Sequence, residues 1–600
     1  MLDQATNRKD SEMLILESEN KIPLNFEAGN PFISDKRVKL SRLGGREQLE
    51  FIHPEKIPYT YNGEVLDKGL PDIVETIFHQ LTKFPNNPYV LNNLGLALLR
   101  QNKWNQAQKK FEKAIEIKKD FYSAKMNLAR TLTNRGKLRE ALAVYKEMEK
   151  IYTGDVKVFM GVAHIYFLQR KLNGAETLLS KVISLDQNNA TAYNNRALTY
   201  LVKGGLNKAI SDLRKAISIN TYFATAENNL GVCYVLQGIP RKAVKHFMTA
   251  LSIDANCGDA AQNLALCFHR SKEYQKAIVL LERYLKRNQS DISARELLAK
   301  SYLMIKKYGI CHKELSVAFK LAKMKYADKT DYDFSHFYNN FGVIYHQQKD
   351  FTKAREYYLR AKSESVSPSE VLYRNIINLY FDTNKINLVK SELEEALEWF
   401  ADNSSLLFLY SRYCFYVQDT EGAINTLKKI IEKEPSFTSA YGFLSFIYSE
   451  VFLNYDLAIE TLNKGLNYTK KSPVLINNLA YNFLMKNDVK KAKANLDIVK
   501  DIKGNVFLTA TKGLLLLREG NVQEGTSLYN KAAFLVHDNP VLHGEVEQKK
   551  NLELAKFYYN RGRKRDSSKY IQRLLASKLK SSVYYAQGEK FAKLINLFKN

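Results

Sequence analysis

Apolar residues recur along most of the chain at the spacing of one helix face. From Pro88 onward they fall at i, i+3, i+4 and i+7 in successive stretches, which is the pattern of amphipathic helices. Turn signals such as Arg135-Gly136-Lys137 and Lys203-Gly204-Gly205 separate these stretches. The pattern therefore predicts short helices that are joined in pairs by tight turns.

Two small residues recur in phase with the helix pairs. The first helix carries one of them at a constant interval, at Gly95, Ala129, Ala163, Ala197, Gly231, Ala265 and Ala299. The second helix carries the other, at Ala107, Ala141, Ala175, Ala209, Ala243, Ala277 and Cys311. Small residues are needed where two helices cross closely, because a larger side chain would separate their axes. We therefore predict seven regular repeats within residues 88–333, ending in an extended loop or helix.

The period loosens beyond Ala299. The next small residue is Gly342, a longer step than any before it, which indicates a lengthened second helix and loop. Further members are Ser411, Ser445, Ala480, Gly513 and Ala555, while Ile377 and its second-helix partner Val389 match poorly. The step from Gly513 to Ala555 is also long and is another irregularity. Residues 334–580 are predicted to form seven looser repeats.

A helix–turn–helix unit with this period, about 34 residues, and with small residues at these positions resembles the tetratricopeptide repeat (TPR). The resemblance covers roughly residues 70–580. It implies an all-α fold, a right-handed alpha-solenoid superhelix of about fourteen repeats. Outside the repeats we expect a flexible arm at 1–56, a short hairpin about Asn62-Gly63 with a capping helix at 57–87, and a basic C-terminal helix or cap at 581–600.

Composition and charge narrow the class of protein. The 600 residues include 90 Lys+Arg against 63 Asp+Glu, a net charge of +27, which favours acidic partners. The five cysteines form no CxxC pair and are expected to be buried, in a reducing compartment. The chain has no secretory signal and no apolar stretch of membrane-spanning length. We therefore expect a cytoplasmic protein with no membrane partner.

Catalytic motifs are missing from the sequence. It contains no phosphate-binding glycine-rich loop, no HExxH and no GxSxG. Its ten histidines are scattered, and His269 near Cys267 has no second pair of metal ligands. We expect no enzyme activity, no metal and no cofactor.

An asparagine column lies two residues before the first small position. Its members are Asn93, Asn127, Asn195, Asn229, Asn263, Asn340, Asn375 and Asn478. An amide both donates and accepts hydrogen bonds, which suits the backbone of an extended ligand. The TPR resemblance places the column on the concave side and implies a ladder like that in the substrate arm of O-GlcNAc transferase. The same amides could instead bond between neighbouring repeats and hold their spacing.

The ladder supports one hypothesis of function. The protein is then a non-enzymatic scaffold or adaptor that binds an extended segment of a partner protein in its concave groove and assembles a multiprotein complex. Arg130 and Arg270 stand at inward-type positions and would join the asparagines in binding. The residue pairs of the two-carboxylate clamp in chaperone-binding TPR domains do not match, so capture of chaperone tails is disfavoured.

A second hypothesis is that the protein binds RNA or DNA. The densest basic cluster consists of Arg561, Arg563, Lys564, Arg565, Lys569 and Arg573, with tyrosines between them. Such residues neutralise phosphates and stack on bases, although a final repeat's turn and solubilising cap would look the same. Two further hypotheses are that the 1–56 arm blocks the groove as a pseudo-ligand, and that an exposed last repeat stacks on a second copy to form a homo-oligomer.

Overall fold

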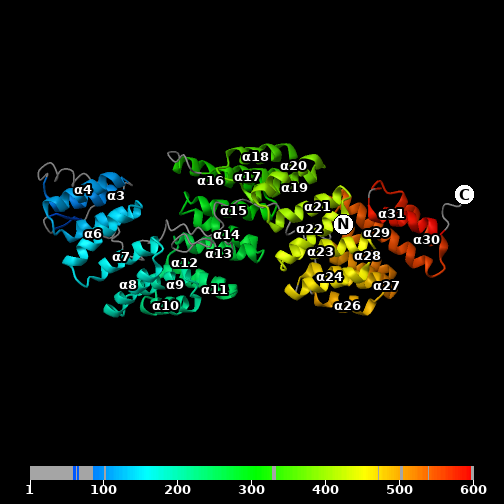
Figure 1. Cartoon of the computed structure of the whole chain (residues 1–600), viewed down its shortest axis with the longest axis horizontal. Helices are drawn as coiled ribbons and strands as arrows, with labels where there is room; N and C mark the ends of the chain where they lie inside the picture. Colours follow the sequence, from blue (N-terminus) through cyan, green and yellow to red (C-terminus); the bar gives the residue numbers. More distant parts are fainter. Residues whose placement is uncertain are drawn as a thin grey trace. The chain divides into compact units, whose positions relative to one another are not determined.

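The computed structural model describes residues 59–61, 64–66, 86–100, 103–326, 333–469, 472–499, 505–537, 539–580 and 582–595 (Figure 1). The chain divides into two compact units at residue 333. The N-terminal unit comprises the described residues up to Tyr326, and the C-terminal unit those from Asp333 to Ile595.

The N-terminal unit is a stack of helix pairs in sequence order. The pairs are α3 (Pro88–Arg100) with α4 (Trp104–Ile117), α5 (Tyr122–Asn134) with α6 (Leu138–Ile151), α7 (Val156–Leu168) with α8 (Leu172–Leu185), α9 (Ala190–Val202) with α10 (Leu206–Ile219), α11 (Ala224–Leu236) with α12 (Pro240–Ile253), α13 (Gly258–Arg270) with α14 (Tyr274–Leu285), and α15 (Ile292–Met304) with α16 (Tyr308–Lys325). The two helices of each pair pack on one another, and within the unit the second helix of a pair packs on the first helix of the next pair. These seven helix pairs span residues 88–325.

The C-terminal unit continues the same arrangement. Its pairs are α17 (Ser335–Gln347) with α18 (Phe351–Glu364), α19 (Glu370–Asp382) with α20 (Ile386–Trp399), α21 (Ser404–Tyr416) with α22 (Thr420–Lys433), α23 (Thr438–Phe446) and the π-helical turn η1 (Ile447–Val451) with α24 (Tyr455–Tyr468), α25 (Pro473–Met485) with α26 (Val489–Ile498), α27 (Val506–Glu519) with α28 (Val522–Phe534), and α29 (Pro540–Tyr559) with α30 (Lys564–Leu575). A last helix, α31 (Val583–Leu594), packs on α29 and α30. The described residues thus contain fourteen helix pairs, and the predicted all-α solenoid is confirmed.

Two short strands precede the helices. β1 (Tyr59–Tyr61) pairs antiparallel with β2 (Glu64–Leu66), with Tyr59 opposite Leu66, and β1 contacts α3. These strands lie where the sequence predicts a hairpin. The expected arm at 1–56 and the expected capping helix before Pro88 lie outside the described residues.

In each described turn within a helix pair, from α5–α6 onward, one residue has left-handed backbone geometry. Gly136 (φ 75°) and Gly204 (φ 81°) adopt it without steric cost, and Arg170 (φ 62°) and Lys272 (φ 59°) adopt it at the equivalent positions. The turn is therefore fixed by the packing of the two helices, since many of these positions lack the residue that prefers the conformation.

Whether the first small position holds glycine or alanine correlates with the size of the residue that it faces in the second helix. A Cβ placed on Gly231 would lie 2.5 Å from the ring of Phe247, and one on Gly342 would lie 2.5 Å from Tyr358. Where the first position is alanine, as in Ala265, the equivalent residue of the second helix is usually a leucine, here Leu281. The two helices therefore approach equally closely in both cases: an aromatic ring in the second helix faces glycine, and a smaller leucine faces the methyl group of alanine.

The irregular steps in the period have local structural causes. The long step after Ala299 includes α16, which has 18 residues, and the step before Ala555 includes α29, which has 20. Ser445 and Ala458 are separated by one more residue than the small positions of the other repeats, and this extra residue is accommodated in η1. The poorly matching Ile377 and Val389 are both fully buried, so that helix pair is intact despite its larger residues.

Candidate partner-binding surfaces

Amide hydrogen bonds connect the asparagine column from repeat to repeat. Nδ2 of Asn263 donates to Oδ1 of Asn228 (2.9 Å), and Nδ2 of Asn229 donates to Oδ1 of Asn194 (3.0 Å). Within α11, Asn228 donates to Asn229 (3.4 Å), which joins the two bonds into one chain across α13, α11 and α9. Equivalent bonds run from Asn127 to Asn92 (3.0 Å) and from Asn375 to Asn339 (2.8 Å). The column therefore holds neighbouring first helices together.

Burial divides the members of this column into two groups. Six are buried, namely Asn93, Asn127, Asn229, Asn263, Asn340 and Asn375. Asn195 and Asn478 are half-buried, and each accepts a hydrogen bond from the asparagine before it (3.2 and 3.4 Å). Contact between a ligand and this column stays a prediction, and the accessible members are Asn195 and Asn478.

The two arginines predicted to join the ladder differ in environment. Arg130 is buried on α5 and interacts with the hydroxyl of Tyr145, whose pKa is raised by burial and lowered in part by this arginine. Arg270 is exposed at the end of α13. Only Arg270 of the two is accessible to a partner in the described structure.

His269 and Lys300 form a polar group beside Arg270. The sequence places Lys300 at an inward-type position, but it does not predict His269 as a binding residue. His269 is half-buried, and burial together with the charge of Lys300 lowers its pKa to about 4, so its ring is neutral at pH 7. Its Nε2 is buried and has no hydrogen-bond partner among the described residues. His269 falls at the position held by Phe167 and Leu201 in other repeats. A histidine at a position that is apolar in other repeats is the feature of the sequence that could have indicated a functional role for His269.

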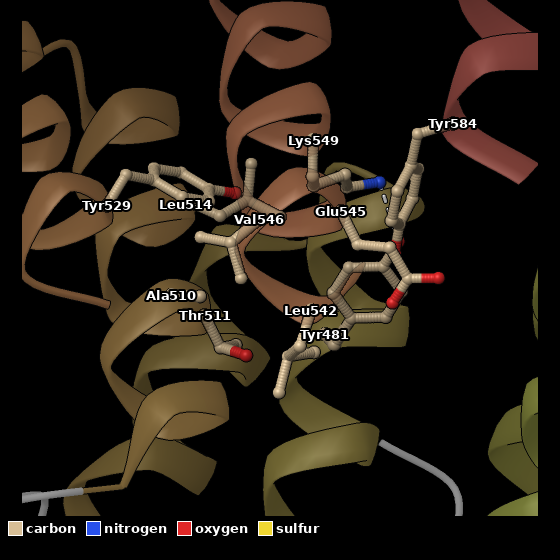
Figure 2. A pocket seen from close by; sticks show the side chains of 10 residues that line it. All are labelled: Tyr481, Ala510, Thr511, Leu514, Tyr529, Leu542, Glu545, Val546, Lys549 and Tyr584. Atoms are coloured by element: carbon tan, nitrogen blue, oxygen red, sulfur yellow. Dashed lines mark hydrogen bonds between the residues drawn. The ribbon is translucent and has the colours of Figure 1, made fainter. Parts of the chain in front are cut away.

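The C-terminal unit contains a small, partly open cavity (Figure 2). Its volume is about 20 Å³, enough for one water molecule. Ten residues line it: Tyr481, Ala510, Thr511, Leu514, Tyr529, Leu542, Glu545, Val546, Lys549 and Tyr584. They come from α25, α27, α28, α29 and α31, so the last helix meets the inner repeats at this point.

Charged side chains form a buried network beside the cavity. Lys549 Nζ donates to Tyr481 Oη (2.7 Å) and lies 3.3 Å from Glu553 Oε1, while Arg518 Nη2 donates to Glu553 Oε2 (2.7 Å). Burial raises the pKa of Glu553, but Lys556, Lys549 and Arg518 outweigh it and hold the pKa at about 2. Burial lowers the pKa of Lys549. Each charge in the network is thus held in place by an opposite one.

Helix α31 contacts residues of this network on two first helices. The Lys549 ammonium lies 4.8 Å from the ring centre of Tyr584, and Gln587 Nε2 donates to Glu450 Oε2 of η1 (3.5 Å). Tyr584 and Ala592 belong to a hydrophobic cluster that also contains residues of α21 to α24. Part of the first-helix side of these repeats is therefore covered by the chain's own last helix.

The basic cluster at 561–573 is exposed, but its aromatic neighbours are already engaged. All six side chains, those of Arg561, Arg563, Lys564, Arg565, Lys569 and Arg573, are exposed. The guanidinium of Arg561 lies 3.7 Å from the ring centre of Phe557, and that of Arg563 lies 4.6 Å from Tyr558. Tyr558 in turn stacks on Tyr570 at 5.6 Å. The cluster offers positive charge, while these rings are occupied by contacts within the chain.

Within the described residues, no group of three or more His, Cys, Asp or Glu side chains is placed to hold a metal ion. In the same part of the chain, no helix combines the length and the apolar character needed to cross a bilayer.

Sequence models of the tetratricopeptide repeat match residues 92–156, 190–222, 235–301 and 335–364. The matches at 190–222 and 335–364 coincide with the pairs α9–α10 and α17–α18, and the unmatched residues between 156 and 190 form the pair α7–α8 of the same kind. The chain therefore contains tetratricopeptide repeats.

Curated relatives share only part of this chain. It is 27% identical over 135 residues to protein O-mannosyl-transferase TMTC3 of Homo sapiens, which is 22% of this chain and 14% of that protein. It is 26% identical over 115 residues to anaphase-promoting complex subunit CDC16 of Saccharomyces cerevisiae, which is 18% of this chain and 14% of that protein. The chain thus spans about a seventh of the length of these relatives.

Solved structures with similar helix arrangements include the APC/C hetero-tetramer Cut9-Hcn1 and MamA. The first is 15% identical with a TM-score of 0.33, and the match covers 76% of this chain and 99% of the other. MamA is 23% identical with a TM-score of 0.24, covering 27% of this chain and 95% of the other.

Proposed function

We propose that this protein is a non-enzymatic scaffold that binds an extended segment of a partner protein on the first-helix side of its N-terminal unit, and so assembles a multiprotein complex. The observation that carries the proposal is the polar group at the ends of α13 and α15. Arg270 is exposed, Lys300 is half-buried, and neutral His269 has a buried Nε2 with no hydrogen-bond partner among the described residues.

The chemistry of this group defines the partner segment. Two cations beside a neutral imidazole suit a segment that presents a carboxylate together with backbone carbonyl or amide groups. Arg270 can donate two parallel hydrogen bonds to a carboxylate, and Lys300 adds a point charge. We therefore expect an acidic residue in the bound segment.

The asparagine column supports this function mainly through geometry. Its buried members hold neighbouring first helices at a fixed spacing, which keeps the binding side rigid before the partner arrives. Asn195 is half-buried, and we propose that it contacts the ligand directly. In the C-terminal unit, α31 covers part of the corresponding side, which favours the N-terminal unit as the binding site.

Peptide selection provides the test. Random linear peptides displayed on phage are selected against the whole chain, and the affinities of the selected peptides are measured by fluorescence anisotropy. The double variant Arg270→Glu with Lys300→Glu should weaken them at least about tenfold, equivalent to about 1.4 kcal/mol. The control is Arg283→Glu with Lys313→Glu, an equal charge change on exposed side chains of α14 and α16. Equal loss in both variants, or no loss in the first, would contradict the proposal.

A second candidate function is nucleic-acid binding at the 561–573 cluster. Its support is the exposure of all six basic side chains. Changing Arg561, Arg563, Lys564 and Arg565 to Gln should reduce the salt dependence of binding, because fewer counterions are released. Failure to bind nucleic acid at low salt would remove this candidate.

A further inference from the structure

The second helices of four successive repeats carry an unusual excess of positive charge. α10, α12, α14 and α16 together hold twelve Lys and Arg residues and only three acidic ones. All twelve basic side chains are exposed. We call these exposed Lys and Arg side chains of α10, α12, α14 and α16 the outer basic face.

The few acids on these helices bind groups of the chain itself. Asp212 is buried and accepts two hydrogen bonds from Arg196, at 2.7 and 2.9 Å. Glu314 accepts one from Arg295 at 2.6 Å, and Glu282 accepts one from the hydroxyl of Tyr302. Their charge is therefore directed at neighbouring residues, and the outer basic face keeps its surplus.

The second helices of the C-terminal unit serve as an internal comparison. α20, α22 and α24 carry five basic and eight acidic residues, whereas α18, α26 and α30 carry eleven basic and four acidic ones. A solubilising outer surface in this fold therefore does not require a positive excess. On α10 to α16 the positive excess runs through four successive second helices of one unit.

One lysine in three of these repeats is also held in a regular position. The ammonium groups of Lys208, Lys242 and Lys276 lie 5.4 to 5.8 Å from the ring centres of Tyr200, Tyr234 and Phe268. The three lysines follow the period of the repeat, so each repeat presents one at an equivalent place. An ordered row of cations suits a linear polymer with a repeating negative charge.

The exposed apolar residues on these helices discriminate between negatively charged partners. They are Met248, Val279, Ile310 and Met324, with no exposed aromatic ring among them. Proteins that bind single strands without sequence preference stack bases on aromatic side chains, and interfacial membrane helices use a continuous apolar face with aromatic anchors. Neither feature is present on the outer basic face, whereas contact with duplex phosphates needs only accessible cations.

We infer that the outer basic face binds the phosphate backbone of double-stranded nucleic acid without reading its sequence. This inference concerns the opposite helices from the proposed peptide site and does not depend on it. The outer basic face and the 561–573 cluster belong to different units of the chain.

The experiment measures the salt dependence of binding to a fluorescein-labelled DNA duplex by anisotropy, with the full chain. The variant changes Lys215, Lys245, Arg283 and Lys313 to Gln, one exposed residue on each of the four helices. Each phosphate contact contributes about 0.9 to the slope of log K against log salt. The variant should therefore lower the slope by up to about 3.6.

The matched control changes Lys390, Lys428, Lys464 and Lys490 to Gln, one exposed lysine on each of α20, α22, α24 and α26. It removes the same charge and should leave the slope unchanged. Circular dichroism verifies that both variants remain helical. An unchanged slope in the first variant, equal effects in both, or binding to phosphatidylserine vesicles with none to the duplex would overturn the inference. So would complete loss of duplex binding in the variant with Arg561, Arg563, Lys564 and Arg565 changed to Gln.

Discussion

The hydroxyl of Tyr481 donates a hydrogen bond of 2.6 Å to Oε1 of Glu450, and it accepts one of 2.7 Å from Nζ of Lys549. Glu450 lies in η1, the π-helical turn that accommodates the extra residue of its repeat. One hydroxyl therefore links the first helices of three repeats, and η1 also accepts the bond from Gln587 of α31.

Tyr481→Phe should destabilise the C-terminal unit. Glu450 is 5% exposed, and loss of the hydroxyl leaves its carboxylate and the Lys549 ammonium each without one buried partner. A cost of about 1–3 kcal/mol is expected, measured by urea unfolding. Tyr468→Phe is the control, because that ring is 62% exposed and its change should stay within about 0.5 kcal/mol. Equal midpoints for Tyr481→Phe and wild type would show that the network adds nothing to stability.

Gly231→Ala should destabilise the N-terminal unit even though alanine favours helix by about 1 kcal/mol. The new Cβ would lie 2.5 Å from the fully buried Phe247 ring, and such overpacking costs about 1–3 kcal/mol. Adding Phe247→Leu recreates the Ala265 and Leu281 combination and should recover part of the loss. Thermal unfolding of the two single variants and the double variant gives the coupling energy. Strictly additive effects would mean that the two positions are independent.

Asn229→Ala should weaken the cohesion between repeats. The change removes the donor to Asn194 and leaves a fully buried amide oxygen without that bond, at a cost of about 1–3 kcal/mol. Asn207→Ala is the control, because Asn207 is exposed at the start of α10. Urea unfolding compares the two. If Asn229→Ala instead leaves stability unchanged and abolishes binding of a selected peptide, the column acts on the ligand and not on the fold.

The sequence predicts most of the fold because the same pattern of small and apolar residues recurs in each repeat. Small residues such as Ala197 and Ala209 mark where two helices must approach, and their phase alone locates the helix pairs. The spacing between Ser445 and Ala458 contains one extra residue, but its accommodation in a π turn, whose Glu450 bonds to Tyr481 and to Gln587 of α31, is a matter of tertiary contacts. Local patterns carry no information of that kind.

The candidate site was less predictable for the same reason. The asparagine column is visible from its regular spacing, yet whether Asn229 faces a ligand or Asn194 depends on side-chain geometry. The contact between Gln587 and Glu450 joins residues 137 positions apart, and no periodic pattern relates them. In contrast, the excess of basic over acidic residues on α10 to α16 can be counted from the sequence once the helices are assigned.

Acid should destabilise the C-terminal unit through Glu553. An unfolded glutamate has a pKa of about 4.3, whereas cations hold the pKa of buried Glu553 at about 2. Its contribution to stability is therefore fully present above about pH 4.3 and is lost as the pH falls toward 2. Glu553→Gln should lower stability at neutral pH and reduce the further loss in acid. The exposed Glu589→Gln is the control and should retain the wild-type pH dependence of the urea midpoint. A variant with the same acid dependence as wild type would contradict this role.

In the native chain, one of the five cysteine thiols should react fast with a thiol reagent and the other four slowly. Burial raises the pKa of Cys233 and Cys311 to about 12 and that of Cys267 to about 11, and it also raises the pKa of Cys414. Since the thiolate is the reacting species, these groups should react with Ellman's reagent at neutral pH only after unfolding. Cys257 is the one cysteine that is not fully buried, so it should account for the fast phase. Cys257→Ser should remove that phase and leave the four slow thiols, which react together in urea. A fast phase that survives in this variant would show that the helix pairs around Cys233, Cys267, Cys311 or Cys414 open readily in the native chain.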